Sequence, residues 1–183
     1  MKRVLLVGGL TEKVLRVLGS KKKWTSAIVG VAAVGMFATV ALASHTPLNF
    51  TTTPLATGNL VNDVKLNSDR VKFQTKDPTD VRVARIDIAP GGYSGWHHHP
   101  GIVIVTVASG AVTFTHSDCS SKTYGPGQPD GAVFVEGGDD PGQASNRGTT
   151  PATSYVTFVA PHANPPVFRI DDHDFPGCAR HHH

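Results

Sequence analysis

Residues 91–110 read GGYSGWHHHPGIVIVTVASG, which is a run of three histidines followed by a Pro-Gly turn and an apolar segment. Side chains of a strand alternate between its two faces, so an extended backbone here points His97 and His99 one way and His98 the other. Two imidazoles on one face are a common way to hold a divalent metal of borderline softness. The spacing therefore predicts His97 and His99 as metal ligands, and it favours His98 as a surface or interface residue.

Short alternating runs of apolar and polar residues continue on both sides of this stretch, separated by Gly, Pro and Asp. They cover residues 71–74, 81–88, 102–107, 111–116, 132–136, 154–159 and 167–170. No segment after residue 44 keeps a 3.6-residue period, so the pattern predicts an all-β domain, either a sandwich or a barrel. Residues 102–107, IVIVTV, are apolar on both faces, which predicts a central strand that is covered on each side.

The spacing of glycine and histidine in the opening stretch resembles the first motif of the cupins, G-x5-H-x-H-x3-4-E-x6-G. Five residues separate Gly91 from His97, as that motif requires. His99 follows, and Gly110 closes the motif at the right distance. The resemblance implies that both histidines are ligands of the same ion.

The second cupin motif, G-x5-P-x-G-x2-H-x3-N, is matched at its two ends, where Gly131 opens it and Asn146 closes it. The resemblance covers about residues 70–160 and is nearest to small, exported, single-domain cupins. It implies a double-stranded β-helix, or jelly-roll, barrel with the site inside it. In this chain an N-terminal hydrophobic export segment precedes that barrel.

Three positions of the cupin motifs carry other residues here. The glutamate position of the first motif falls on Val103, and the histidine position of the second falls on Gly142. The Pro-x-Gly of the second motif reads Gly137-Gly138-Asp139. The resemblance implies three histidine ligands and one glutamate, of which His97 and His99 remain. Two imidazoles and water predict a weak and open metal site.

Three side chains near the vacant positions are candidates for a compensating ligand. Asp140 lies in the loop before the vacant histidine position, Gln143 lies just after that position, and His116 lies on the strand that follows the first motif. The alternative interpretation of the loop that contains Asp140 is a solvated turn that binds no metal. The metal would be a divalent ion, and the donor types leave Mn, Fe, Ni, Cu and Zn open.

Two kinds of function fit this pattern. An ion on His97 and His99 with one further ligand would leave positions for water and substrate, which predicts a metal-dependent enzyme of oxidoreductase, lyase or isomerase type acting on a small organic molecule. The alternative is a non-catalytic binding or structural module in which the metal site is vestigial. The incomplete ligand set disfavours the oxalate-degrading chemistry that the resemblance would otherwise imply. No nucleophile elbow, phosphate loop, dinucleotide fingerprint or Cys-x-x-Cys supports another class.

Residues 1–43 are predicted to direct export. Lys21–Lys23 precede an uncharged apolar run over residues 27–43, which ends in Ala41-Leu42-Ala43. Positive, apolar and small residues in this order are typical of a signal peptide, and the run also suits an N-terminal membrane anchor over residues 26–43. In both interpretations the lysines keep the N-terminus in the cytoplasm, so the rest is predicted to be secreted, periplasmic or on the extracellular face.

The charge balance changes once this leader is set aside. It holds seven of the 17 Lys and Arg and one of the 14 Asp and Glu, so residues 44–183 carry 10 basic and 13 acidic side chains, a net charge of −3. A mildly acidic domain lacks the basic surface that phosphate backbones require, which excludes nucleic acid as a predicted partner. The predicted partner is therefore a small-molecule ligand or substrate, and the resemblance to cupins also allows a homodimer.

The exported part is predicted to divide into three segments: a linker or N-terminal arm over residues 44–68, the cupin β-barrel over residues 69–170, and a C-terminal tail over residues 171–183. Its two cysteines are Cys119 and Cys178. An even number of cysteines in an exported chain favours a disulfide, which would tie the tail to the barrel. Two free thiols are the alternative.

Overall fold

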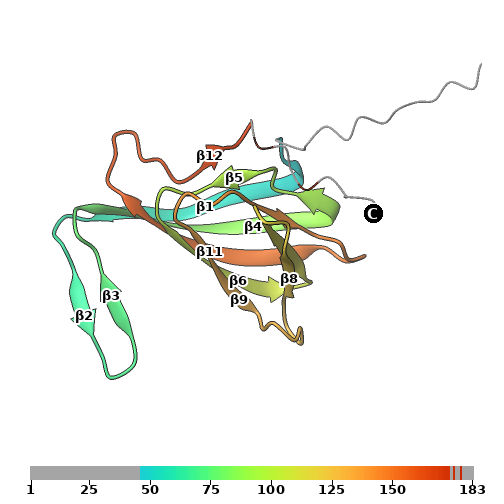
Figure 1. Cartoon of the computed structure of the whole chain (residues 1–183), viewed down its shortest axis with the longest axis horizontal. Coiled ribbons are helices and arrows are strands. Elements are labelled where there is room, and N and C mark those ends of the chain that lie inside the picture. Colours follow the sequence, from blue (N-terminus) through green and yellow to red (C-terminus); the bar gives the residue numbers. More distant parts are fainter. Residues whose placement is uncertain (1–45, 174, 176–177, 179–183) are drawn as a thin grey trace, which may run out of the picture. The chain divides into compact units, whose positions relative to one another are not determined.

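The computed structural model describes residues 46–173, 175 and 178 (Figure 1). Its regular structure is entirely β, and the described part of the chain forms no helix long and apolar enough to cross a membrane. The signal peptide or anchor predicted for residues 1–43 lies outside the described residues.

Ten of the twelve described strands pair into two halves of one antiparallel sheet, and β2 and β3 form a separate hairpin. In chain order the twelve strands are β1 (Leu48–Leu60), β2 (Lys65–Asn67), β3 (Lys72–Gln74), β4 (Thr79–Tyr93), β5 (His97–His98), β6 (Ile102–Ser109), β7 (Val112–His116), β8 (Ser121–Tyr124), β9 (Val133–Gly137), β10 (Gly142–Ser145), β11 (Ala152–Pro161) and β12 (Ile170–Asp171). One half has the order β1-β4-β11-β6-β9, whose strands run side by side in Figure 1, and the other has the order β12-β5-β10-β7-β8. The halves join where Ser145 of β10 pairs with Tyr93 of β4. The result is a nearly closed barrel, and the predicted all-β double-stranded β-helix is confirmed.

Alternation along β6 shows how the core is built. Val103, Val105 and Val107 are buried, whereas Ile102 and Ile104 between them are exposed. The strand lies between β11 and β9, as a central strand should, but only one of its faces packs on the core. The prediction that both faces are covered is therefore wrong. Each buried valine contributes about 1.5–3 kcal/mol of hydrophobic stabilisation.

Residues 44–68, expected as a linker or arm, contain a long strand of the barrel. β1 pairs with β4 from Leu48 opposite Tyr93 to Leu60 opposite Thr79. It has few apolar residues to alternate and is mostly exposed, so its stability comes from pairing and from threonines that favour strands. The barrel thus begins before the expected boundary at residue 69. The exposed hairpin of β2 and β3 projects from it in Figure 1.

The C-terminal tail is held against the barrel at several points. Cys178 forms the predicted disulfide with Cys119, with an S–S distance of 2.12 Å. β12 pairs with β5, and just beyond it Asp172 Oδ1 lies 2.7 Å from His98 Nδ1. The side chain of His98, expected at the surface, is therefore only 19% exposed beneath this segment.

Candidate metal centre

His97 and His99 converge on the inside of the barrel, at the short strand β5. The two residues are 5% and 4% exposed, and their ring centroids lie 4.8 Å apart with nearly perpendicular planes. The turn that follows depends on Gly101, where a Cβ would lie 2.0 Å from the carbonyl oxygen of Val159. Because only glycine allows this close approach to β11, the histidine segment stays against the neighbouring strand.

The hydrogen bonds of the two rings leave one nitrogen of each without a proton. Nδ1–H of His97 donates to the carbonyl of Gly95 at 2.9 Å, and Nδ1–H of His99 donates to the carbonyl of Phe168 at 2.5 Å. In a neutral imidazole the other nitrogen, Nε2, then carries the lone pair that binds metal. Nε2 of His99 is buried and has no hydrogen-bond partner among the described residues. A buried acceptor in this state is costly unless a ligand satisfies it.

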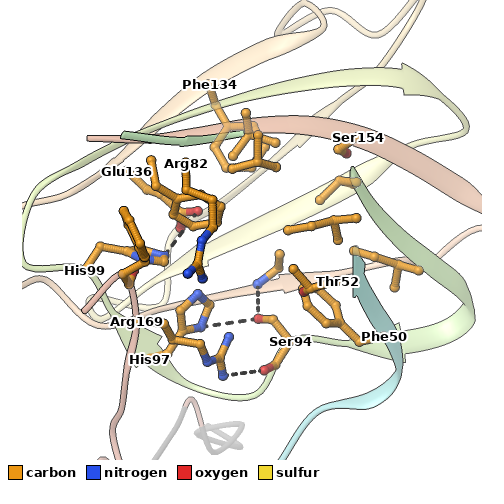
Figure 2. Close-up of a pocket in the computed structure, with 18 residues that line it drawn as sticks. Phe50, Thr52, Arg82, Ser94, His97, His99, Phe134, Glu136, Ser154 and Arg169 are labelled. Carbon is orange, nitrogen blue, oxygen red and sulfur yellow. Dashed lines mark hydrogen bonds and ion pairs between the residues drawn. The ribbon is translucent and has the colours of Figure 1, made fainter. Parts of the chain in front are cut away.

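The third group at the site is Glu136, which no sequence motif indicated. It lies on β9 directly opposite Val103 of β6, and Val103 occupies the glutamate position of the first cupin motif. Directly paired residues of an antiparallel ladder point to the same face with Cβ atoms about 5 Å apart. The neighbouring strand therefore supplies the carboxylate. Its Oε1 lies 3.6 Å from His99 Nε2, and the ligand atoms of the two histidines and Glu136 all lie within 4.8 Å of one another (Figure 2).

The missing histidine of the second motif has a steric explanation. Gly142 on β10 is paired with His97 on β5, so this position adjoins the site. A Cβ at residue 142 would lie 2.3 Å from Cζ of Phe114. Phe114 belongs to the core and packs on Phe134 with ring centroids 5.2 Å apart. An aromatic ring thus occupies the space of a fourth ligand, and three candidate protein ligands remain.

Burial sets the protonation of the three groups. Desolvation lowers the pKa of His97 well below its ordinary value and the pKa of His99 to about 4, and the nearby charge of Arg169 acts in the same direction. Desolvation raises the pKa of Glu136 to about 8, whereas Arg169 acts to lower it. At neutral pH the site therefore contains two neutral imidazoles and a protonated carboxyl group. A cation that displaces the carboxyl proton would meet a carboxylate and two lone pairs.

The three groups line a cavity of about 250 Å³ between the two halves of the sheet (Figure 2). Most of its wall is apolar, and the polar groups gather around the histidines. The apolar side chains include Phe50, Ile88, Phe134, Val156, Phe158 and Phe168. An apolar cavity with a few convergent polar groups is the usual form of a small-molecule site.

Two of the three candidate compensating ligands, His116 and Asp140, lie apart from the paired histidines. His116 Nδ1 is 3.7 Å from Asp140 Oδ2, and the two form a separate, partly exposed cluster. Gln143 lies on β10. Among the His, Cys, Asp and Glu side chains that the structure describes, neither His116 nor Asp140 belongs to the group that could share an ion with the paired histidines.

Alternation could have drawn attention to Glu136. β9 reads VFVEG, with Phe134 buried and Val133 and Val135 exposed, so Glu136 falls on the inward parity. A glutamate at an inward position of an apolar strand is unusual without a function. Its proximity to His97 and His99 could not be predicted from the local sequence, because it depends on the pairing of β9 with β6.

Several solved structures resemble this chain. The cupin_2 domain of an XRE family transcriptional regulator from Enterobacter cloacae matches at 19% identity over 63% of this chain and 100% of that chain, with a TM-score of 0.41. A conserved protein of unknown function from Streptococcus pyogenes matches at 20% identity over 56% and 78%, with a TM-score of 0.39. Oxalate oxidase in complex with glycolate matches at 24% identity over 48% and 51%, with a TM-score of 0.37. The chain thus spans about half the length of the oxalate oxidase.

Sequence comparison adds no relative, since no protein family and no curated protein matches the chain. Two of the matching structures are described as cupins, namely the cupin_2 domain and a sugar phosphate isomerase from a cupin superfamily. The likeness is one of fold, and it carries no information about substrate or reaction.

Proposed function

We propose that this cupin-fold chain is a metal-dependent enzyme that binds one divalent ion through His97, His99 and Glu136 and acts on a small organic molecule in the adjoining cavity. The observation that carries the proposal is the buried Nε2 of His99, which has no hydrogen-bond partner among the described residues. A site without a ligand would be expected to place a donor there. Three protein ligands leave coordination positions free, as in catalytic sites, whereas structural zinc sites are closed by four.

The residues of the site have distinct parts in holding the ion. The carbonyls of Gly95 and Phe168 accept the Nδ1–H groups and so fix both imidazole rings with Nε2 available. Glu136 supplies a carboxylate once its proton has left, and the charge of Arg169 favours that ionisation. When bound, the ion supplies Lewis-acid or redox chemistry to a molecule in the cavity.

Two histidines and one carboxylate favour Fe(II) or Zn²⁺ among the divalent ions that the sequence left open. This donor set with open positions is typical of non-haem Fe(II) oxygenases. Two histidines and a glutamate also hold the catalytic zinc of metalloproteases. We therefore expect the protein to select one of these two ions.

The proposed place of action is outside the cytoplasm. Disulfides persist in oxidising compartments and are rare in cytosolic proteins, and the bond between Cys119 and Cys178 is formed. This supports the export expected from residues 1–43. Cell fractionation with N-terminal sequencing distinguishes a cleaved signal from a retained anchor, and full-length protein confined to the cytoplasm would contradict export.

The metal content of the purified protein tests the proposal. A run of three histidines such as His181–His183 would bind metal adventitiously, so the protein is prepared without these residues. We expect about one Fe or Zn per chain by elemental analysis, and at least about a tenfold loss of affinity in Glu136→Gln, since even outer-shell partners of a metal ligand contribute that much. His116→Ala is the control and should keep the metal. A stoichiometric ion that survives both Glu136→Gln and His97→Ala would overturn the proposal.

A non-catalytic ligand-binding protein is the second candidate function. The observation that favours it is the mainly apolar cavity of about 250 Å³, which could hold a small molecule without metal. For a metal-binding protein, EDTA should lower the Tm, because removing a ligand of the native state destabilises it. A Tm that ignores both EDTA and added divalent ions would favour the binding protein.

A further inference from the structure

Two arginines reach the cavity of the candidate metal centre, and neither is a candidate ligand of the ion. Arg82 of β4 and Arg169 just before β12 both line the cavity, and Figure 2 shows their guanidinium groups near His97. Positive side chains next to a cation site repel the cation unless an anion lies between them. The cavity is therefore charged in a way that suits a negatively charged ligand.

Arg82 occupies an inward position on β4, where its strand face also carries the buried Asp80, which is engaged by His162 and Ala163. On the same face, Ile86 and Ile88 line the cavity. On the opposite face, Arg85 and Asp87 form an ion pair with an Nε–Oδ2 distance of 2.9 Å. Arginine is almost never placed inside a barrel unless it is paired, so its position on the inner face calls for a partner.

The described contacts of the Arg82 guanidinium are to a ring and a hydroxyl group. Its Cζ lies 4.2 Å from the ring centre of Phe168, and its Nε donates to Thr57 Oγ1 at 3.4 Å. Among the described residues, no Asp or Glu forms an ion pair with it. Stacking on Phe168 orients the guanidinium plane, which leaves N–H groups that can donate to both oxygens of a carboxylate.

Arg169 is already engaged by the protein. Its NH2 group lies 2.7 Å from Asp171 Oδ1 and also donates to the carbonyl of Ser94 at 2.7 Å. Asp171 therefore offsets its charge, and Arg82 is the guanidinium left to bind a ligand. With a divalent ion held by one carboxylate, Glu136, the wall of the cavity keeps an excess of positive charge.

We propose that the cavity binds a small organic carboxylate, whose charged end is held by Arg82 and whose apolar body packs on the phenylalanine-rich wall. This inference rests on the proposed function, which places the ion beside that carboxylate, and it names the class of substrate. An apolar cavity of about 150 Å³ admits benzene. The larger volume of about 250 Å³ therefore suffices for an acid with an aryl or branched alkyl body.

Binding of simple acids and their amides tests the inference. Benzoate, phenylacetate and 2-methylpropanoate are titrated calorimetrically into the full chain, with and without metal, and the amide of each acid is the neutral control. We expect the best acid to bind more tightly than its amide. Arg82→Gln should weaken that acid at least about tenfold and leave the amide unchanged, because a charge-assisted pair of hydrogen bonds is lost. Arg82→Lys keeps the positive charge but cannot donate two parallel hydrogen bonds to one carboxylate. Its affinity for the acid should therefore lie between those of the unaltered chain and Arg82→Gln.

Arg85→Gln is the matched control, because Arg85 lies on the opposite face of the same strand and pairs with Asp87. It should bind the acid as the unaltered chain does. Thermal unfolding shows whether Arg82→Gln is folded, and if it is not, the same titration of Arg82→Lys decides. Acid affinity that is unchanged in the folded Arg82 variant overturns the inference.

The remaining outcomes separate this inference from the proposed function. If the protein retains metal but none of the three acids binds better than its amide, the carboxylate assignment is overturned and the metal enzyme stands. If no metal is retained while an acid still binds in a way that depends on Arg82, the carboxylate assignment is supported and the proposal of a metal-dependent enzyme is overturned.

Discussion

The carboxyl group of Glu136 lies beside His99 inside the barrel, and burial raises its pKa to about 8 from an ordinary value of 4.5. Between these two pH values the native state keeps a proton that the unfolded state has released. The stability of the metal-free protein is therefore lost as the pH rises through this window. The buried imidazoles of His97 and His99 act in the opposite sense, mainly below about pH 7, where the unfolded chain takes up protons on them.

We expect the metal-free protein to lose roughly 1 kcal/mol of unfolding free energy between pH 6.5 and pH 8, because the loss from Glu136 exceeds the gain from the two histidines. Glu136→Gln, which has no carboxyl proton to lose, should remove most of this dependence. Chemical denaturation in EDTA at a series of pH values measures both proteins. An unaltered chain whose stability is flat across this range, or an equal slope in the variant, would contradict the assigned protonation of Glu136.

At the scale of strands, pairing separates what could be predicted from what could not. Alternation and turn residues predicted an all-β domain, and the resemblance of the motifs to cupins implied that it is a barrel. The His-x-His spacing predicted that two imidazoles would share a face. Glu136 meets them only because β9 pairs with β6 so that Glu136 lies opposite Val103, and no local pattern records that register. β1 was not predicted for a related reason. Its sequence has little apolar alternation, and the strand is held in place by its pairing with β4.

The packing of β7 against β10 predicts the effect of filling the vacant histidine position. Gly142→Ala should destabilise the protein by about 1–3 kcal/mol, because its Cβ would overlap the ring of Phe114. Gly58→Ala is the control, since nothing lies within 4 Å of a Cβ there. Denaturation curves compare the two variants. If Gly142→Ala were as stable as Gly58→Ala, the ring could move aside freely, and the steric account of the three-ligand site would be wrong.

Over the described barrel as a whole, the C-terminal tail closes around the candidate site. The carbonyl of Phe168 orients His99, and Asp172 pairs with His98. Cys178 then anchors the segment to Cys119, with a sequence separation of 59. The same segment that completes the cavity wall is thus covalently tied to the barrel, in a bond suited to an oxidising compartment.

The double variant Cys119→Ser/Cys178→Ser should lose about 2–4 kcal/mol of unfolding free energy, because the cross-link restricts the unfolded chain. Metal content should persist, since the proposed ligands lie on β5, β9 and the turn after β5. Urea unfolding compares the variant with the oxidised and the reduced unaltered chain. An unchanged midpoint would show that the disulfide does not stabilise the fold, and loss of metal would show that the tail is needed to form the site.

The shared ion at His97, His99 and Glu136 is tested most directly by anomalous diffraction from crystals of the protein without residues 181–183, grown with Zn²⁺ or Fe(II). We predict one strong peak in the cavity, about 2.0–2.2 Å from Nε2 of each histidine and from a carboxylate oxygen of Glu136. A cavity without a peak, or a peak only between His116 and Asp140, would contradict the account.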